Sequence, residues 1–84
     1  MPESVADRVK RVTVKVLKVD PASIKPESRF AADLGAESIQ SVELMAEFEE
    51  EFDIAMNEDE ALAVKTFGGA VEFIEKCLKE QHEG

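Results

Sequence analysis

The sequence has few of the side chains from which catalytic and binding sites are usually built. Its 84 residues include no tryptophan, no tyrosine, one cysteine and one histidine. Without those aromatic rings, and without a glycine-rich phosphate loop, the chain offers no stacking platform for bases and no phosphate cradle. The lone cysteine, Cys77, cannot form an internal disulfide.

Long hydrophobic runs are also absent from the sequence. No stretch approaches the roughly 20 apolar residues of a transmembrane helix, and the N-terminus lacks the apolar core of a signal peptide. We therefore expect no membrane insertion and a cytoplasmic location. At 84 residues the chain should form a single domain, 1–84, too small for a substrate cleft of its own.

Neither a catalytic triad nor a metal site is predicted. The only histidine, His82, lies in the tail 80–84, which we expect to be disordered, so it cannot be held against a serine. The carboxylates between Asp53 and Glu60 lack the alternating ligands and central glycine of an EF-hand loop. The chain is therefore predicted not to be an enzyme and to hold no selective metal ion.

Basic residues are missing from the middle of the chain. Residues 30–64 contain eleven acidic residues and no basic one, and the net charge of the whole chain is −9. This balance excludes nucleic-acid binding, because phosphate backbones attract lysine and arginine. A block so one-sided predicts basic partners and encounters that are steered by charge and weakened by salt.

Apolar residues recur at helical spacing, which predicts an all-α fold: a four-helix bundle of three longer helices and one short helix, with a long first loop. The first helix should begin at Ser4 and end by Val19 or Asp20, because Pro21 disfavours helical geometry in the residue before it. Alternating valines make a strand over residues 11–19 the alternative. We reject the strand because no second strand candidate exists to pair with it.

Residues 20–37 form the predicted loop, which is long for a compact domain and should be anchored to it. Ile24, Phe30 and Leu34 are the expected anchors in the core. Asp33 should organise the turn before the second helix through hydrogen bonds from backbone amides. A short helical turn would fit within this loop.

Two further helices complete the predicted bundle. Asn57 should cap a short helix that ends near Lys65, and Thr66 should cap the last helix. Gly68 and Gly69 lie in the first turn of that last helix. Each costs roughly 1 kcal/mol relative to alanine, so this turn should fray.

The second helix follows a glycine-containing turn and begins near a serine. Ser38 stands where the turn becomes the helix, so its hydroxyl should project beside unpaired backbone N–H groups. Their partial positive potential favours an attached phosphate. The simpler interpretation is that Ser38 only caps the helix.

The same helix carries two apolar faces. The core face consists of Leu44, Met45, Phe48 and Phe52. The opposite face, here called the docking strip, consists of Ile39, Val42 and Ala46. It is flanked by an acidic rim of Glu43, Glu49, Glu50 and Asp53. An apolar strip fenced by carboxylates is typical of a surface that docks partners, although scattered exposed apolar residues are common and geometry alone does not decide.

These residues resemble the acyl carrier proteins. The family motif, D-L-G-A-D-S-L followed by V-E-L, is similar to Asp33-Leu34-Gly35-Ala36-Glu37-Ser38-Ile39, followed by Ser41-Val42-Glu43-Leu44 and Glu49-Glu50-Glu51-Phe52. The similarity extends from about Asp7 to Ile74. It implies that Ser38 carries 4'-phosphopantetheine and that acyl intermediates are held on it as thioesters for fatty-acid, lipid or polyketide-type biosynthesis. Glu37 and Ile39 replace the usual aspartate and leucine.

The resemblance also implies partners. These are a phosphopantetheinyl transferase and acyl-transferring and synthase enzymes with basic docking patches, which would meet a monomer at Glu37, the docking strip and the acidic rim. The core should also open to admit the acyl chain between the second helix and the short one, at Leu44, Met45, Phe48, Leu62, Val64 and Ile74. Two alternatives are an aminoacyl or peptidyl carrier of a specialised pathway and an unmodified helical adaptor with the same fold.

Overall fold

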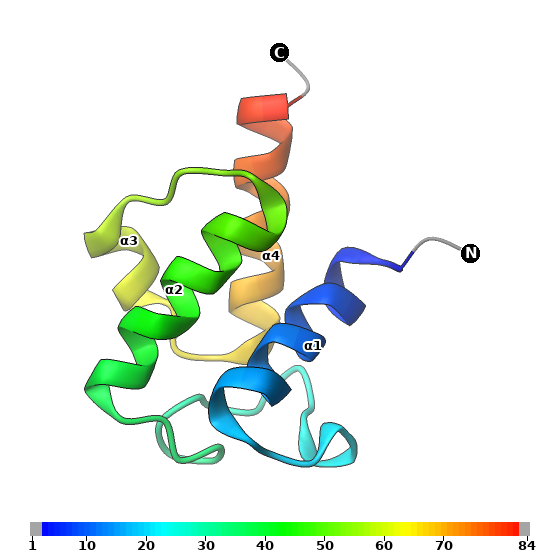
Figure 1. Cartoon of the computed structure of the whole chain (residues 1–84), viewed down its shortest axis with the longest axis vertical. Coiled ribbons are helices and arrows are strands. Elements are labelled where there is room, and N and C mark those ends of the chain that lie inside the picture. The colour runs from blue at the N-terminus through cyan, green and yellow to red at the C-terminus, as the bar shows by residue number, and fades with distance from the viewer. Residues whose placement is uncertain (1–2, 83–84) are drawn as a thin grey trace.

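Four α-helices make up most of the structure, a computed structural model that describes residues 3–82 (Figure 1). They are α1 (Val5–Leu17), α2 (Ser38–Phe52), α3 (Glu58–Ala63) and α4 (Phe67–His82), with a 3-10 turn, η1 (Pro21–Ser23), in the first loop. Within the described residues no strand forms beyond an isolated antiparallel bridge between Arg29 and Thr66. The prediction of an all-α bundle with three longer helices and one short helix is confirmed.

Helix α1 begins as predicted and ends slightly early. The Ser4 hydroxyl oxygen accepts the N–H of Asp7 at 3.1 Å. The helix stops at Leu17 because Lys18 takes a left-handed conformation, with φ of 59°, and donates its N–H to the Val14 carbonyl. The strand alternative for residues 11–19 is thereby excluded, since most of that segment is helical.

The core lies between α1, α2 and α4, and α1 packs against both of the others. It consists mainly of Val9, Val12, Leu17, Leu44, Phe48, Phe52, Phe67, Ala70, Ile74 and Cys77. Within residues 3–82, no helix combines the length and the apolar character that crossing a bilayer requires.

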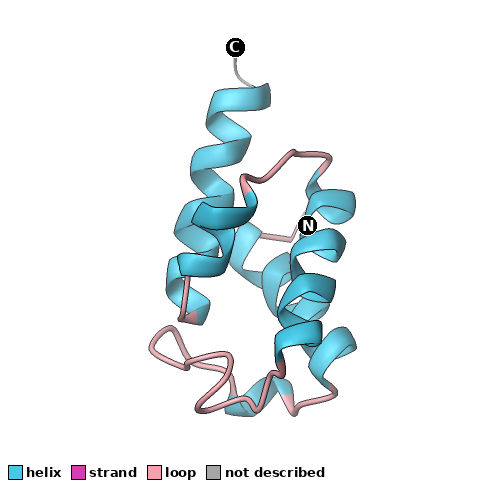
Figure 2. Cartoon of the chain, turned by 90° about the vertical axis from the view of Figure 1, so that its left-hand side faces the viewer, coloured by secondary structure: helices cyan, strands magenta, loops and turns pink. Residues whose placement is uncertain are grey.

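The first loop closes the end of the bundle opposite the C-terminus (Figure 1 and Figure 2). Ile24, Phe30 and Leu34 are buried, as predicted for its anchors. The short helical turn expected in this loop is η1. The loop is therefore part of the packed structure and holds the residues that precede α2 in a fixed place.

The same loop binds the start of α4. Gly68 donates its N–H to the Pro26 carbonyl, and Phe67 donates to the Ser28 carbonyl, both at 2.8 Å. The Thr66 hydroxyl caps the helix by accepting the N–H of Gly69 at 3.0 Å. The expectation that this turn frays is wrong, because hydrogen bonds to the loop offset the low helix propensity of its glycines.

Helix α4 also continues further than the sequence suggested. Gln81 exchanges two hydrogen bonds with the backbone N–H and carbonyl of Ala55, each 2.8 Å long. Nε2 of His82 lies 2.7 Å from the Asp53 carbonyl oxygen. The predicted disorder is therefore wrong for residues 80–82, which are helical; residues 83–84 lie outside the described part of the chain.

Candidate functional site

Ser38 is the first residue of α2 and is exposed. The residue in the N-cap position is Glu37, in an extended conformation, and its backbone N–H is accepted by the Gln40 side chain at 2.9 Å. The simpler interpretation, in which Ser38 caps the helix, is therefore wrong. Since Glu37 and Gln40 share the capping interaction, the Ser38 hydroxyl is left at the surface beside the unpaired amides of the first helical turn.

The turn that precedes Ser38 is held by Asp33, as predicted. One carboxylate oxygen of Asp33 accepts the backbone N–H of Arg29 at 2.7 Å and lies 3.3 Å from its guanidinium Nε. These hydrogen bonds lower the pKa of the Asp33 carboxyl below its usual value. Gly35 takes a left-handed φ of 73°, with open space where a side chain would stand. The turn therefore fixes the chain while leaving the surroundings of Ser38 uncrowded.

The two faces of α2 lie as the sequence indicated. Leu44, Phe48 and Phe52 are buried in the core, whereas Met45, predicted for the same face, is half-buried and outside the core. In the docking strip, Ile39 is 69% exposed, Val42 is 51% exposed and Ala46 is exposed as well. Large apolar side chains at such exposure are covered by nothing within the described residues, so the strip is accessible to a partner.

The acidic rim is less uniform than the sequence suggested. Glu43, Glu50 and Asp53 are exposed. Glu49 is half-buried, and its carboxylate accepts the backbone N–H of Met56 at 2.9 Å. Glu49 thus also supports the connection between α2 and α3, a role that helical spacing could not reveal because Met56 lies outside α2.

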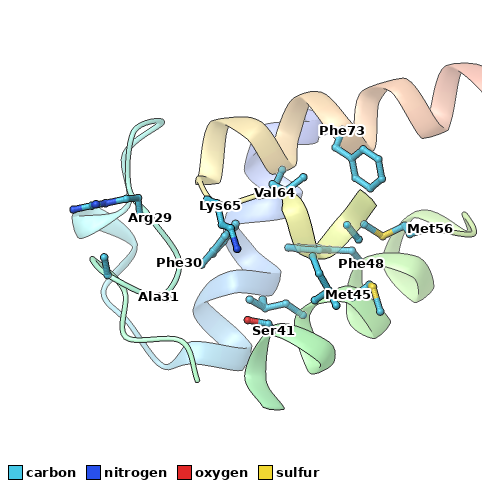
Figure 3. Close-up of a pocket in the computed structure, with 15 residues that line it drawn as sticks. Arg29, Phe30, Ala31, Ser41, Met45, Phe48, Met56, Val64, Lys65 and Phe73 are labelled. Atoms are coloured by element: carbon cyan, nitrogen blue, oxygen red, sulfur yellow. The ribbon is translucent and has the colours of Figure 1, made fainter. Parts of the chain in front are cut away.

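An apolar cavity of about 290 Å³ lies beside α2 (Figure 3). It is lined by side chains from α2, α3, α4 and the loops before α2, between α2 and α3, and after α3: Arg29, Phe30, Ala31, Ala32, Ser41, Leu44, Met45, Phe48, Met56, Ala61, Leu62, Val64, Lys65, Ala70 and Phe73. For comparison, an apolar cavity of about 150 Å³ holds benzene. The space is therefore large enough for an acyl chain of roughly six to ten carbons.

Five of the six residues predicted to form an acyl cavity line this one, namely Leu44, Met45, Phe48, Leu62 and Val64. Ile74 does not; it is fully buried in the core, and its neighbour Phe73 lines the cavity instead. A one-residue step on a helix turns a side chain by roughly 100°, so the choice between the two depends on how α4 is rotated against the bundle.

A serine–histidine catalytic pair does not form. Ser38 is the first residue of α2, whereas His82 contacts the backbone of Asp53 just past its last residue. A helix of 15 residues separates these points by roughly 22 Å.

Cys77 is buried, and burial raises the pKa of its thiol above the usual value. Within residues 3–82, no three histidine, cysteine or acidic side chains gather closely enough to hold a metal ion.

Comparison with known proteins adds two findings to this geometry. Residues 7–74 match the family model described as the phosphopantetheine attachment site. The chain is also 48% identical, over 69 residues, to a protein named acyl carrier protein from Sulfurovum sp. (strain NBC37-1); the alignment covers 82% of this chain and 92% of that protein. The matched segment contains the turn, Ser38 and the whole of α2.

Proposed function

Because this chain belongs to the acyl carrier protein family, we propose that Ser38 is the residue that bears its phosphopantetheine arm. The cofactor of this family is a covalently attached 4'-phosphopantetheine, and its members are carriers rather than catalysts. When bound, the group supplies a thiol that holds an acyl group as a thioester. The task of the chain is to expose the attachment site, shelter the acyl chain and present both to enzymes.

One observation carries the assignment to Ser38: its hydroxyl is exposed at the start of α2 while Glu37 and Gln40 perform the capping. A phosphodiester at this position would be favoured by the helix N-terminus, where unpaired N–H groups and the macrodipole stabilise negative charge. The open space at Gly35 leaves room for the arm.

The partners are enzymes that modify, load and unload the carrier. Acyl carrier proteins interact with a phosphopantetheinyl transferase and with synthase enzymes. Here such enzymes would dock on the docking strip and on the exposed carboxylates of Glu37, Glu43 and Glu50. Asp53 and the half-buried Glu49 would extend this surface toward the end of α2. Weak and successive binding suits a surface recognised mainly by charge. Cytoplasmic residence is part of this proposal.

The cargo is an acyl chain of fatty-acid, lipid or polyketide type, held in the cavity between α2 and α3. The lining is mainly aliphatic and aromatic, and Met45 and Met56 can adapt to chains of different length. An aminoacyl group would bring a charged amine, which such a lining does not stabilise. The cavity therefore favours an acyl carrier over the aminoacyl alternative.

Intact-mass spectrometry of protein produced together with a broad-specificity phosphopantetheinyl transferase tests the assignment of Ser38. The wild type should gain one arm, Ser38→Ala should gain none, and Ser41→Ala, which changes a serine one turn further along α2, should gain one. An arm on Ser38→Ala would place the attachment elsewhere. A wild type that stays unmodified would favour the unmodified adaptor.

A second comparison tests whether Glu37 and Ile39 select the partner enzymes. The double variant Glu37→Asp and Ile39→Leu restores the usual family residues at both positions. We expect generic fatty-acid enzymes to use it better than the wild type. Equal use would mean that the two replacements do not tune partner choice.

A further inference from the structure

The lining of the cavity is apolar except at three side chains: Arg29, Ser41 and Lys65. All three belong to the same end of the cavity. Ser41 is in the first turns of α2, and the Lys65 carbonyl accepts the N–H of Phe30, the neighbour of Arg29, at 3.0 Å. Figure 3 shows Lys65 beside Phe30 at this end, with Met56 and Phe73 at the other. The cavity thus has one polar end and one apolar end.

Of the two cationic side chains, only Lys65 is free to meet a ligand. The guanidinium of Arg29 is paired with Asp33, and its side chain extends away from the other lining residues (Figure 3). Lys65 takes part in none of the ion pairs formed within residues 3–82 and its side chain is exposed. It is also the first basic residue after Arg29, since residues 30–64 contain none.

The polar end of the cavity is the end nearest the attachment point. Ser41 follows Ser38 by three residues, and residues so spaced are neighbours on one side of a helix. Because the phosphopantetheine arm is long enough to reach either end of the cavity, the polarity of the lining sets the direction of the chain: the thioester end stays beside Ser41 and Lys65, and the tail extends toward Met56 and Phe73. Its hydrocarbon tail would be buried. Oxygen atoms close to its thioester would stay at the entrance, because burying them without a hydrogen bond is unfavourable.

From this arrangement we propose that Lys65 is a specificity-determining residue which donates a hydrogen bond to an oxygen on the β-carbon of the bound acyl chain. The inference rests on the proposed function, since it requires an acyl chain tethered at Ser38 and held in the cavity. It adds the class of cargo: β-keto or β-hydroxy acyl chains with an apolar tail are sheltered better than fully reduced chains of the same length. A charged donor at the entrance of an apolar cavity distinguishes the two, whereas the apolar lining does not.

The test compares octanoyl and β-hydroxy-octanoyl thioesters of the phosphopantetheinylated protein by their rates of cleavage with hydroxylamine, because a β-hydroxyl, unlike a β-ketone, does not itself react with hydroxylamine. Each variant is compared with the wild type bearing the same acyl group, so the intrinsic reactivity of the thioester cancels. Lys65→Met keeps the length of the side chain and removes its charge. We expect it to speed cleavage of the β-hydroxy thioester about fivefold and to leave the octanoyl rate unchanged.

Three controls make the outcome specific. Lys65→Arg retains a charged donor and should keep the protection. Lys76→Met makes the same change of net charge at an exposed position of α4 outside the cavity lining, and it should change neither rate. Because Lys65 holds the loop through its backbone carbonyl, its side-chain variants should melt at the temperature of the wild type.

The failures of the two proposals are distinguishable. In one outcome, the octanoyl thioester of the wild type resists hydroxylamine, and Lys65→Met changes the cleavage rates of both thioesters equally or of neither. This outcome would overturn the role of Lys65 and leave the sheltering cavity standing. Octanoyl and β-hydroxy-octanoyl thioesters that are both cleaved as fast as those of free pantetheine would overturn the sheltering cavity and the role of Lys65 together.

Discussion

Arg8 and Glu51 join α1 to α2 through two hydrogen bonds from a single guanidinium. Nε of Arg8 lies 2.8 Å from a carboxylate oxygen of Glu51, and Nη2 donates to the Glu51 backbone carbonyl at 2.7 Å. The same guanidinium lies 4.4 Å from the centroid of the Phe52 ring, while Nη2 of Arg11 donates to the same carboxylate oxygen of Glu51 at 2.9 Å. The end of α2 is therefore fixed to α1 by charge, by a backbone acceptor and by an aromatic face.

We expect Glu51→Gln to lower the free energy of unfolding by about 1 kcal/mol at neutral pH, since both groups are only partly buried. The hydrogen bond from Arg8 is the main cause that lowers the pKa of Glu51 from 4.5. A carboxyl whose pKa is depressed by folding stabilises the fold above its unfolded value and loses this contribution as the pH falls through its folded value. The difference between wild type and Glu51→Gln should therefore be constant above pH 4.5 and shrink below it.

Urea unfolding at a series of pH values measures this difference. Glu72→Gln, an exposed change on α4, is the control and should have little effect on stability at any pH. A gap between wild type and Glu51→Gln that stays the same down to pH 3 would show that the ion pair contributes nothing through its charge.

Charge reversal separates two members of the acidic rim. Glu43 is exposed, so Glu43→Lys should slow modification by the phosphopantetheinyl transferase roughly threefold to tenfold through the association rate, without changing the melting temperature. Glu49→Lys should slow association too, but it also removes the acceptor of the Met56 N–H and should destabilise the fold by about 1 kcal/mol.

Stopped-flow or steady-state modification kinetics at several salt concentrations check this prediction, with Glu75→Lys on α4 as a matched change of charge. Added salt should slow the wild type more than Glu43→Lys, since it screens the attraction that the variant has already lost. If neither the substitution nor added salt changes the modification rate, the interface lies away from α2.

Gly68→Ala tests the contact between the first loop and α4. A Cβ at this position would stand 2.9 Å from the carbonyl oxygen of Pro26, a backbone atom that cannot move alone. Although alanine favours the helix by roughly 1 kcal/mol, displacing the loop should outweigh that gain and leave a net loss of about 1–2 kcal/mol. Thermal unfolding measures it, and Glu75→Ala, exposed on the same helix, should change stability by less than about 0.5 kcal/mol. A stabilised Gly68→Ala would contradict the close packing of this turn.

Local hydrogen bonding accounts for what the sequence predicted well. Ser4, Asn57 and Thr66 each cap a helix by accepting an amide three residues further on, so the sequence around each contains the whole interaction. The buried anchors of the loop followed similarly from apolar residues placed among polar ones. The core and exposed faces of α2 followed from helical periodicity alone.

Partners distant in sequence account for what it did not predict. The first turn of α4 is held by Pro26 and Ser28, and its last turn by Ala55. The local glycines and the polar tail therefore could not show that both ends of this helix are ordered. At the candidate site, the capping role of Glu37 required the conformation of the turn before it. The polar end of the cavity could not be predicted either, because it depends on the packing of Lys65 against the first loop.

The limited volume of the cavity leads to the last prediction. Each methylene moved from water into an apolar cavity stabilises the folded protein by about 0.8 kcal/mol, and 1 kcal/mol raises the melting temperature of a domain this small by about 4–8 °C. Melting temperatures of a series of saturated acyl forms should therefore rise with chain length and level off once the cavity is full.

Ala61 lines the cavity on α3, so Ala61→Leu should occupy part of it and move the plateau to shorter chains. Ala63→Leu makes the same change at an exposed position of the same helix and should leave the plateau where it is. If all acyl forms melt with the arm-only form, the chain lies outside the cavity; if both variants shift the plateau equally, the chain is buried somewhere other than beside Ala61.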